Sequence, residues 1–300
     1  MFPIIPANSV TAASGNSEGI FGYGTSTWSD KLSITNLVSN AGVISSDVTG
    51  VGTGRYALAA CEYGGDKGIF GFGTIGASST AVTNLVSNAG VVATDVTGVG
   101  IARNTLAACS YDEDKGIFGF GNAASLTAVT NLVSNAGVVS SDVTGVGTAR
   151  QGVAACEYGE DKGIFGFGRP GGYVSTTNLV SNAGVVSSDV TGVGTARSYL
   201  AACSYGGDKG IFGFGTTGSY VSTTNLVSNA GVVSTDVTGV GTARQYLAAP
   251  EYDGDKGIFG YGTTASATAV TNLVSNAGVV ATDTTGVGTA RGGLGACSFN

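Results

Sequence analysis

Short apolar stretches alternate with breaks of Gly, Asn or Asp along almost the whole chain. Around Arg150 there are four such stretches, at residues 150–158, 162–168, 177–181 and 185–194. The breaks include Gly159-Glu160-Asp161 and Asn182-Ala183-Gly184, which are typical of tight turns. Short β-prone stretches bounded by turn residues predict antiparallel strands. We therefore expect this segment to form one four-stranded antiparallel sheet.

The same pattern fills the chain from Gly19 to Phe299 in six near-identical copies, with a spacing of 47 residues between Arg103 and Arg150. A marker arginine, interpreted as a structural residue of the repeat, occupies the same place in every copy: Arg55, Arg103, Arg150, Arg197, Arg244 and Arg291. A four-strand unit of this length has the size of one β-propeller blade.

The two ends of the repeat region complement each other. The region begins with the second stretch of a unit, Glu18–Gly24, and ends with a first stretch, Arg291–Phe299. Together they supply one whole unit, which would leave no exposed edge between units. The prediction is an all-β, six-bladed β-propeller over residues 18–300, with four antiparallel strands per blade and a closing blade shared by the N- and C-terminal strands. Residues 1–17 are predicted to form an extended arm.

The unit resembles a Kelch repeat. The resemblance lies in an arginine followed by a small apolar strand, a short acidic hairpin, an aromatic-x-aromatic-Gly string such as Phe70-Gly71-Phe72-Gly73, and a later pair of strands containing Asp. It covers almost the whole chain and implies a β-propeller built from such blades. Within the second strand, Phe165 and Phe167 alternate with glycine, so aromatic rings are expected between blades where glycine admits a close neighbour.

Composition narrows the possible partners. The net charge is −7, and the few basic residues are spread over the repeats, which argues against nucleic acid. No apolar run reaches the length of a membrane helix, and the N-terminus has no basic region typical of a secretion signal. Five cysteines share one repeat position, and Pro250 takes the sixth. We interpret them as buried free thiols in a reducing compartment.

The residues available for catalysis are few. The chain has no His, which excludes Ser-His-Asp and Cys-His arrangements and removes the commonest zinc and copper ligand. Each unit has an Asp eight residues before its marker arginine, as at Asp189, interpreted as stabilising a turn or pairing with an Arg. The Asp161-Lys162 type of pair is interpreted as a solvated turn. We expect no enzyme activity, no cofactor and no metal.

Two windows differ between the copies: the loop after the second strand and the pair of residues after the marker arginine. In a four-stranded antiparallel blade both emerge on one face of the disc. The candidate residues for binding a ligand or partner on that face are Trp28, Tyr56, Arg169, Tyr173, Tyr199, Tyr220 and Tyr246. Rigid aromatic side chains lose little entropy on binding. The alternative is that these surface loops simply vary.

The leading functional hypothesis is a non-enzymatic structural and interaction protein. The amino-acid sequence of the repeats resembles that of propeller proteins of tailed bacteriophages and other large DNA viruses. This resemblance implies a virion component, a fibre or capsid-surface protein assembled in the host cytoplasm, which contacts other virion proteins through residues 1–17 and a host-surface protein or glycan through its disc. The alternative is a lectin-like, glycan-binding module, in which Tyr and Trp stack on sugars and Arg169 binds hydroxyls.

Overall fold

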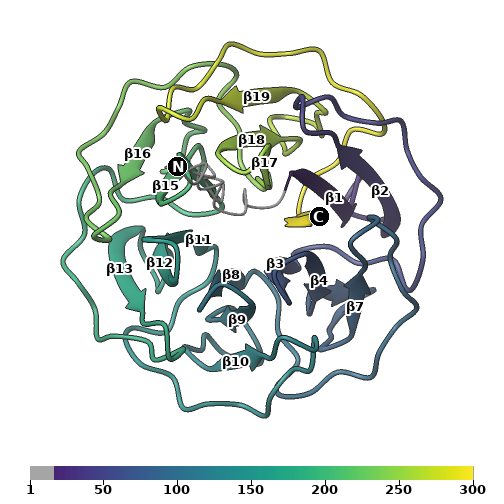
Figure 1. The fold of residues 1–300 in the computed structure, drawn as a ribbon, viewed down its shortest axis with the longest axis horizontal. Coiled ribbons are helices and arrows are strands. Elements are labelled where there is room, and N and C mark those ends of the chain that lie inside the picture. Colours follow the sequence, from purple (N-terminus) through teal and green to yellow (C-terminus); the bar gives the residue numbers. More distant parts are fainter. Residues whose placement is uncertain (1–16, 300) are drawn as a thin grey trace, which may run out of the picture.

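The computed structural model describes residues 17–299, and the expected N-terminal arm lies outside them except for Ser17. These residues form an all-β structure of small antiparallel sheets. Six of the sheets have three strands each and are arranged in a ring around a central axis (Figure 1). No helix among the described residues is long and apolar enough to span a membrane.

Each three-stranded sheet consists of neighbouring strands of one repeat, with the strand nearest the axis followed outward by the second and third. The sheets are β20 (Gly295–Phe299), β1 (Glu18–Gly24) and β2 (Leu32–Val38); β3 (Ala59–Tyr63), β4 (Lys67–Gly71) and β7 (Thr83–Val86); β8 (Ala107–Tyr111), β9 (Lys115–Gly119) and β10 (Thr130–Val133); β11 (Ala154–Tyr158), β12 (Lys162–Gly168) and β13 (Val174–Val180); β14 (Ala201–Tyr205), β15 (Lys209–Gly213) and β16 (Thr224–Val227); and β17 (Glu251–Tyr252), β18 (Lys256–Gly260) and β19 (Thr271–Val274). A further hairpin joins β5 (Thr74–Ile75) to β6 (Ser78–Ser79).

The expected fourth strand of each repeat is not a regular strand. The segment after β13 touches its neighbour only through isolated bridges, including Thr177 with Val190. Side chains take hydrogen bonds that a continuous ladder would use: Asn178 Nδ2 donates to the Ser187 carbonyl at 3.0 Å, and the Leu179 amide donates to Ser187 Oγ at 2.9 Å. Three regular strands and one loosely paired segment therefore replace the predicted four.

The predicted pairing of the two ends of the repeat region is confirmed. Strand β1 pairs antiparallel with β20, in a register that runs from Glu18 with Phe299 to Gly22 with Gly295. The first and last parts of the chain thus form one sheet with β2 (Figure 1).

Neighbouring sheets are also joined by a closed ring of six backbone hydrogen bonds around the axis. Each amide of the ring donates to the carbonyl of the equivalent residue one unit away, over 2.7 to 2.9 Å. The members are Ala57, Thr105, Gly152, Tyr199, Tyr246 and Gly293. The bond from Ala57 to Gly293 joins the first unit to the last. All six residues have positive φ between 50° and 63°.

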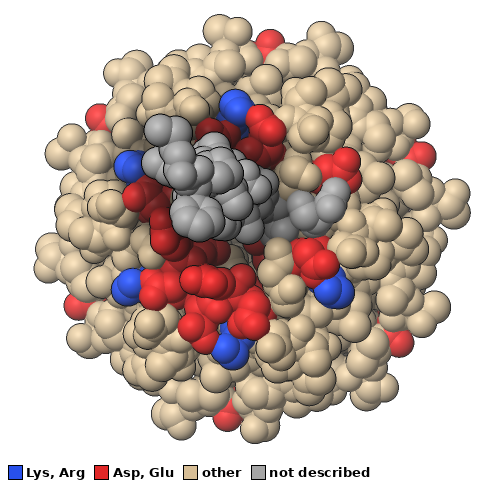
Figure 2. Space-filling model, in the orientation of Figure 1, with Lys and Arg blue, Asp and Glu red and all other residues tan. Residues whose placement is uncertain are grey.

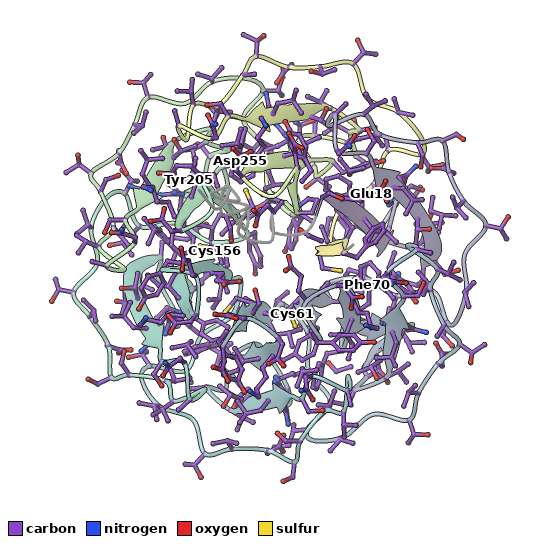
Figure 3. All side chains as sticks on the ribbon, viewed as in Figure 1. Glu18, Cys61, Phe70, Cys156, Tyr205 and Asp255 are labelled. Atoms are coloured by element: carbon purple, nitrogen blue, oxygen red, sulfur yellow. The ribbon has the colours of Figure 1, made fainter. Side chains whose placement is uncertain are left out.

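The core consists of side chains from one sheet inserted against glycines of the next. A Cβ placed on Gly166 would lie 2.7 Å from Cζ of Phe212, and one on Gly163 would lie 2.5 Å from Sγ of Cys109. Phe212 also meets Phe167 edge-on, with ring centroids 5.2 Å apart. The predicted packing of aromatics against glycine is confirmed, and Figure 3 shows Phe70 between sheets with Cys61 and Cys156 near the axis. All five cysteines are buried and free.

The marker arginines are completely buried between sheets. Arg197, for example, stacks 4.2 Å from the ring centroid of Phe167 and donates from Nε to the Phe214 carbonyl at 2.9 Å. An unpaired buried cation would be costly, and the aromatic face and the carbonyl both stabilise it. The interpretation of these arginines as structural residues agrees with this placement.

The repeated Asp lies beside an arginine, in agreement with one of the two interpretations drawn from the sequence. Asp189 is 3.9 Å from NH1 of Arg150, the arginine at the start of its own repeat. It accepts hydrogen bonds from the amide and hydroxyl of Thr148 at 3.1 and 2.6 Å. Asp47 binds Thr289 in the same way, so this contact also connects the two ends of the repeat region.

Candidate ligand-binding face

The backbone ring fixes the base of a face rich in aromatic residues. Tyr199 and Tyr246 are members of that ring and have φ of 55° and 56°. A residue other than glycine is strained in this region, and such strain persists where surrounding bonds enforce it, often at functional sites. Here the amide of Tyr246 donates to the carbonyl of Tyr199 at 2.9 Å. The ring therefore holds two large side chains side by side at one end of the axis.

Four aromatic side chains form a continuous cluster on this face. The rings of Tyr199 and Tyr246 are stacked, with centroids 4.3 Å apart and an angle of 26° between them. Trp28 meets Tyr246 edge-on at 5.0 Å and Tyr56 at 5.6 Å. Trp28 is 45% exposed. The side chain of Lys31 places its Nζ 4.6 Å from the Tyr56 centroid.

A groove of about 640 Å³ extends from this cluster. Its walls come from three neighbouring units, and the lining residues are Arg169, Tyr173, Tyr199, Thr216, Gly218, Ser219, Tyr220, Gln245 and Tyr246. Five of the seven predicted residues line the groove, and Trp28 and Tyr56 join it through Tyr246. The structure thus brings together the residues of both variable windows. The isolated β-bridge between Gln151 and Arg169 explains this proximity, since Gln151 belongs to one variable window and Arg169 to the other.

The polar groups of the groove are held at its edges. Arg169 lies 5.3 Å from the Tyr173 centroid and donates from Nε to the Gly171 carbonyl at 3.3 Å. No carboxylate among residues 17–299 forms an ion pair with it. Tyr220 donates its hydroxyl to the Thr264 carbonyl at 2.8 Å, which fixes its ring. Burial, and then the neighbouring Tyr199, raise the pKa of Tyr246, which stays a neutral phenol.

Sequence reasoning missed several residues of the groove. Gln245 belongs to a variable window, and its position beside Tyr246 could have identified it. Thr216 and Gly218 lie in the other variable window, the loop after the second strand. Thr216 holds the position of Arg169 in the preceding copy, so comparison of the copies could have identified it as well.

The opposite face carries the first hairpins. On the face seen in Figure 2, Asp and Glu side chains gather around the axis. Lys162 forms an ion pair with Asp161, and Asn182 Nδ2 donates to the same carboxylate at 3.1 Å. Ion pairs this exposed contribute little to stability, in agreement with the solvated turns expected from the sequence.

No family model and no curated protein sequence matches the chain. Comparison with solved structures finds 231 similar chains. One is a novel fungal alcohol oxidase of the AA5 family in complex with copper, 17% identical, with a TM-score of 0.55 over 91% of this chain and 64% of that one. The present chain thus spans under two thirds of that protein. The likeness at this identity concerns the fold alone.

The copper of that complex does not fit the residues of this chain. The sequence has no His, and residues 17–299 contain no group of three or more Cys, Asp or Glu placed to hold a metal ion. Imidazole and thiolate are the usual copper ligands in proteins, and the cysteines here are separately buried.

Proposed function

We propose that the protein is a non-enzymatic binding module that holds a carbohydrate on its aromatic face. The observation that carries the proposal is the groove beside the stacked pair of Tyr199 and Tyr246. At its edge lies Arg169, which forms no ion pair within residues 17–299. A sugar ring has an apolar C–H face that stacks on aromatic side chains, and hydroxyls that need polar partners. Gln245 and Thr216 line the same groove and offer an amide and a hydroxyl.

The rigidity of the face supports this function. Tyr199 and Tyr246 are fixed by the backbone ring, and Tyr220 by its bond to Thr264. Side chains that are ordered before the ligand arrives lose little entropy on binding. We propose no reaction for the site, since its lining residues lack a paired acid and base.

A glycan array tests the proposal. The intact protein should bind a defined set of glycans, and Tyr199→Ala combined with Tyr220→Ala should abolish those signals. Alanine is compatible with the backbone at Tyr199, because Ala57 holds the equivalent ring position with φ of 54°. The control is Val232→Ala on the rim, where the side chain is 64% exposed. Silence across the array, or binding that survives the double substitution, refutes the proposal.

The scaffold and its biological setting belong to the same proposal. We interpret the ring as a Kelch-like six-bladed β-propeller, supported by the six sheets, the ring of six backbone bonds and the pairing of β1 with β20. We further propose that this disc belongs to a virion and attaches through residues 1–17. Deletion of residues 1–17 should leave the fold intact and abolish incorporation into the parent particle. Retained incorporation would refute the anchoring role.

A further inference from the structure

The arginine at the edge of the groove occurs in one copy of the repeat only. Every copy forms a backbone bridge between this position and the residue after a marker arginine. The residues that take the place of Arg169 in the other copies are Thr25, Thr74, Asn122, Thr216 and Thr263. The fold therefore does not require a cation here, and Arg169 is exposed. A long charged side chain in place of a short neutral one indicates a role in the groove rather than in packing.

The loop that carries Arg169 restrains its side chain. Residues 169–173 form the short loop between the paired strands β12 and β13, so Arg169 and Tyr173 are its first and last residues. The guanidinium lies 5.3 Å from the Tyr173 ring centroid, and Nε donates to the Gly171 carbonyl at 3.3 Å. Among residues 17–299, Nη1 and Nη2 have no hydrogen-bond acceptor. The end of the guanidinium is thus available to a ligand.

Two terminal guanidinium nitrogens offer the geometry that a carboxylate requires. Their parallel N–H groups match the two oxygens of one carboxylate, and such charge-assisted bonds are roughly twice as strong as neutral ones. A sugar hydroxyl presents a single oxygen, so it leaves one side of the fork without a partner. The free end of Arg169 therefore favours a ligand with a carboxylate over a neutral one.

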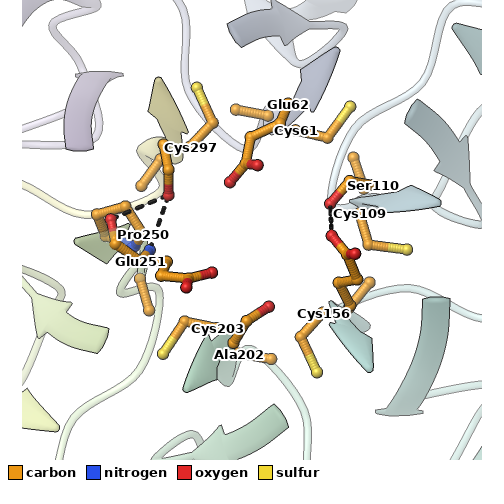
Figure 4. Close-up of a pocket in the computed structure, with 18 residues that line it drawn as sticks. Cys61, Glu62, Cys109, Ser110, Cys156, Ala202, Cys203, Pro250, Glu251 and Cys297 are labelled. Atoms are coloured by element: carbon orange, nitrogen blue, oxygen red, sulfur yellow. Dashed lines mark hydrogen bonds between the residues drawn. The ribbon is translucent and has the colours of Figure 1, made fainter. Parts of the chain in front are cut away.

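No carboxylate within the groove competes for Arg169. The described residues that line the groove include one basic and no acidic side chain. The glutamates near the axis are at its opposite end, where Glu62, Glu157 and Glu251 line another cavity of about 50 Å³ (Figure 4). Burial raises the pKa of Tyr246, and the positive charge of Arg169 opposes this shift. The field of Arg169 therefore extends to the stacked tyrosines, where a sugar would lie.

We propose that the groove selects a sugar that carries a carboxylate, which Arg169 binds end-on while the sugar ring lies against the tyrosines. Sialic and uronic acids share this chemistry. The inference rests on the carbohydrate-binding function proposed above and names the class of sugar. The groove of about 640 Å³ lies within the range of about 300–1,000 Å³ typical of ligand sites, so it admits an acidic sugar together with a neighbouring residue of a glycan.

Matched pairs of glycans test this selectivity on an array and by calorimetry. The probes end in sialic, glucuronic or galacturonic acid, and each is compared with its methyl ester, which keeps the sugar ring and removes the charge. At least one free acid should bind about tenfold or more tightly than its ester.

The possible failures separate this inference from the function on which it rests. Methyl esters or neutral glycans that bind as tightly as the acids would overturn the selectivity and leave the carbohydrate function in place. A preference for sulfated glycans over the carboxylates would also overturn it. Silence toward acids, esters and neutral glycans alike would overturn both proposals.

Three variants assign the selectivity to Arg169. Arg169→Thr introduces the residue of four other copies, so the fold should be retained. Its affinity for the free acid should fall about tenfold or more, and that for the ester should change less than about twofold. Arg169→Lys keeps the charge but not the fork, and its affinity for the acid should lie between those of the native protein and Arg169→Thr. Native affinity in Arg169→Lys would contradict the end-on contact.

The control variant is Lys209→Gln, which removes one positive charge from the opposite face, where Lys209 pairs with Asp208. Its affinity for the acid should change less than about twofold. Equal effects of Lys209→Gln and Arg169→Thr would indicate general electrostatic attraction and overturn the inference.

Discussion

The contact between Gly163 and Cys109 offers a direct test of how neighbouring sheets pack. Gly163 opens the second strand of its sheet, and Cys109 lies on the first strand of the preceding sheet. A Cβ on Gly163 would lie 2.5 Å from Cys109 Sγ, 3.2 Å from the Ser110 carbonyl oxygen and 3.4 Å from Val180 Cβ. The thiol is the worst clash and the only one of the three that a side-chain truncation removes.

The expected energies follow from these distances. Gly163→Ala should lower the free energy of unfolding by about 2–3 kcal/mol, because an added methyl in a filled core typically costs about 1–3 kcal/mol. Cys109→Ala alone should cost about 1–2 kcal/mol, since it removes a buried sulfur atom and leaves a small cavity. In the double variant the new methyl occupies the space of the sulfur. Its cost should fall below the sum of the single costs by about 1–3 kcal/mol.

Equilibrium unfolding in denaturant, followed by tyrosine and tryptophan fluorescence, measures these quantities. Gly171→Ala is the matched control: a Cβ there has no atom within 4 Å, so its effect should stay within about 0.5 kcal/mol. If Gly163→Ala is as harmless as the control, or if the two single costs simply add, the proposed interlock between sheets is incorrect.

Three further predictions concern closure, pH and the thiols. In denaturant titrations, Asp47→Ala and Asp189→Ala should each lower the free energy of unfolding by about 1–2 kcal/mol. The two effects should agree closely, because each Asp joins neighbouring units; a much smaller effect of Asp47→Ala would indicate that the two ends of the repeat region are not joined. The Glu157 pKa rises from 4.5 to about 8 on folding, so stability should fall as pH rises between these values, and Glu157→Gln should remove this part of the pH dependence of unfolding. Burial raises the pKa of the Cys109 thiol, so a thiol reagent should modify the native protein no faster than it opens; rapid modification would contradict the buried position.

The repeat made several features of the fold predictable. The pairing of Glu18–Gly24 with the C-terminal strand followed from the phase at which the repeat begins and ends. The irregularity of the fourth segment was not predictable from the sequence, because the residues between Val185 and Val190 have the pattern of a strand. This segment forms only isolated bridges, since the side chains of Asn178 and Ser187 form hydrogen bonds with backbone groups of the two segments.

The candidate binding site was also predictable in part, because the copies of the repeat can be compared with one another. Differences between copies selected the loops that carry Tyr199 and Tyr220, and the structure brings these loops to one groove. The partner of Asp189 was missed because the contact joins residues 41 positions apart in different units. Glu157 was missed as well, because it lies in strand β11 (Ala154–Tyr158), whose alternation does not reveal which side faces the axis.

The fluorescence of Trp28 tests the proposed carbohydrate site most directly. Trp28 is the single tryptophan of the chain, and it contacts Tyr246, which lines the groove. Titration with a glycan identified on the array should change its emission in a saturable way, with the same affinity as calorimetry, and Tyr199→Ala combined with Tyr220→Ala should abolish the change. A glycan that binds by calorimetry with unchanged emission, and with equal affinity in the double variant, would place the binding site elsewhere and contradict the account.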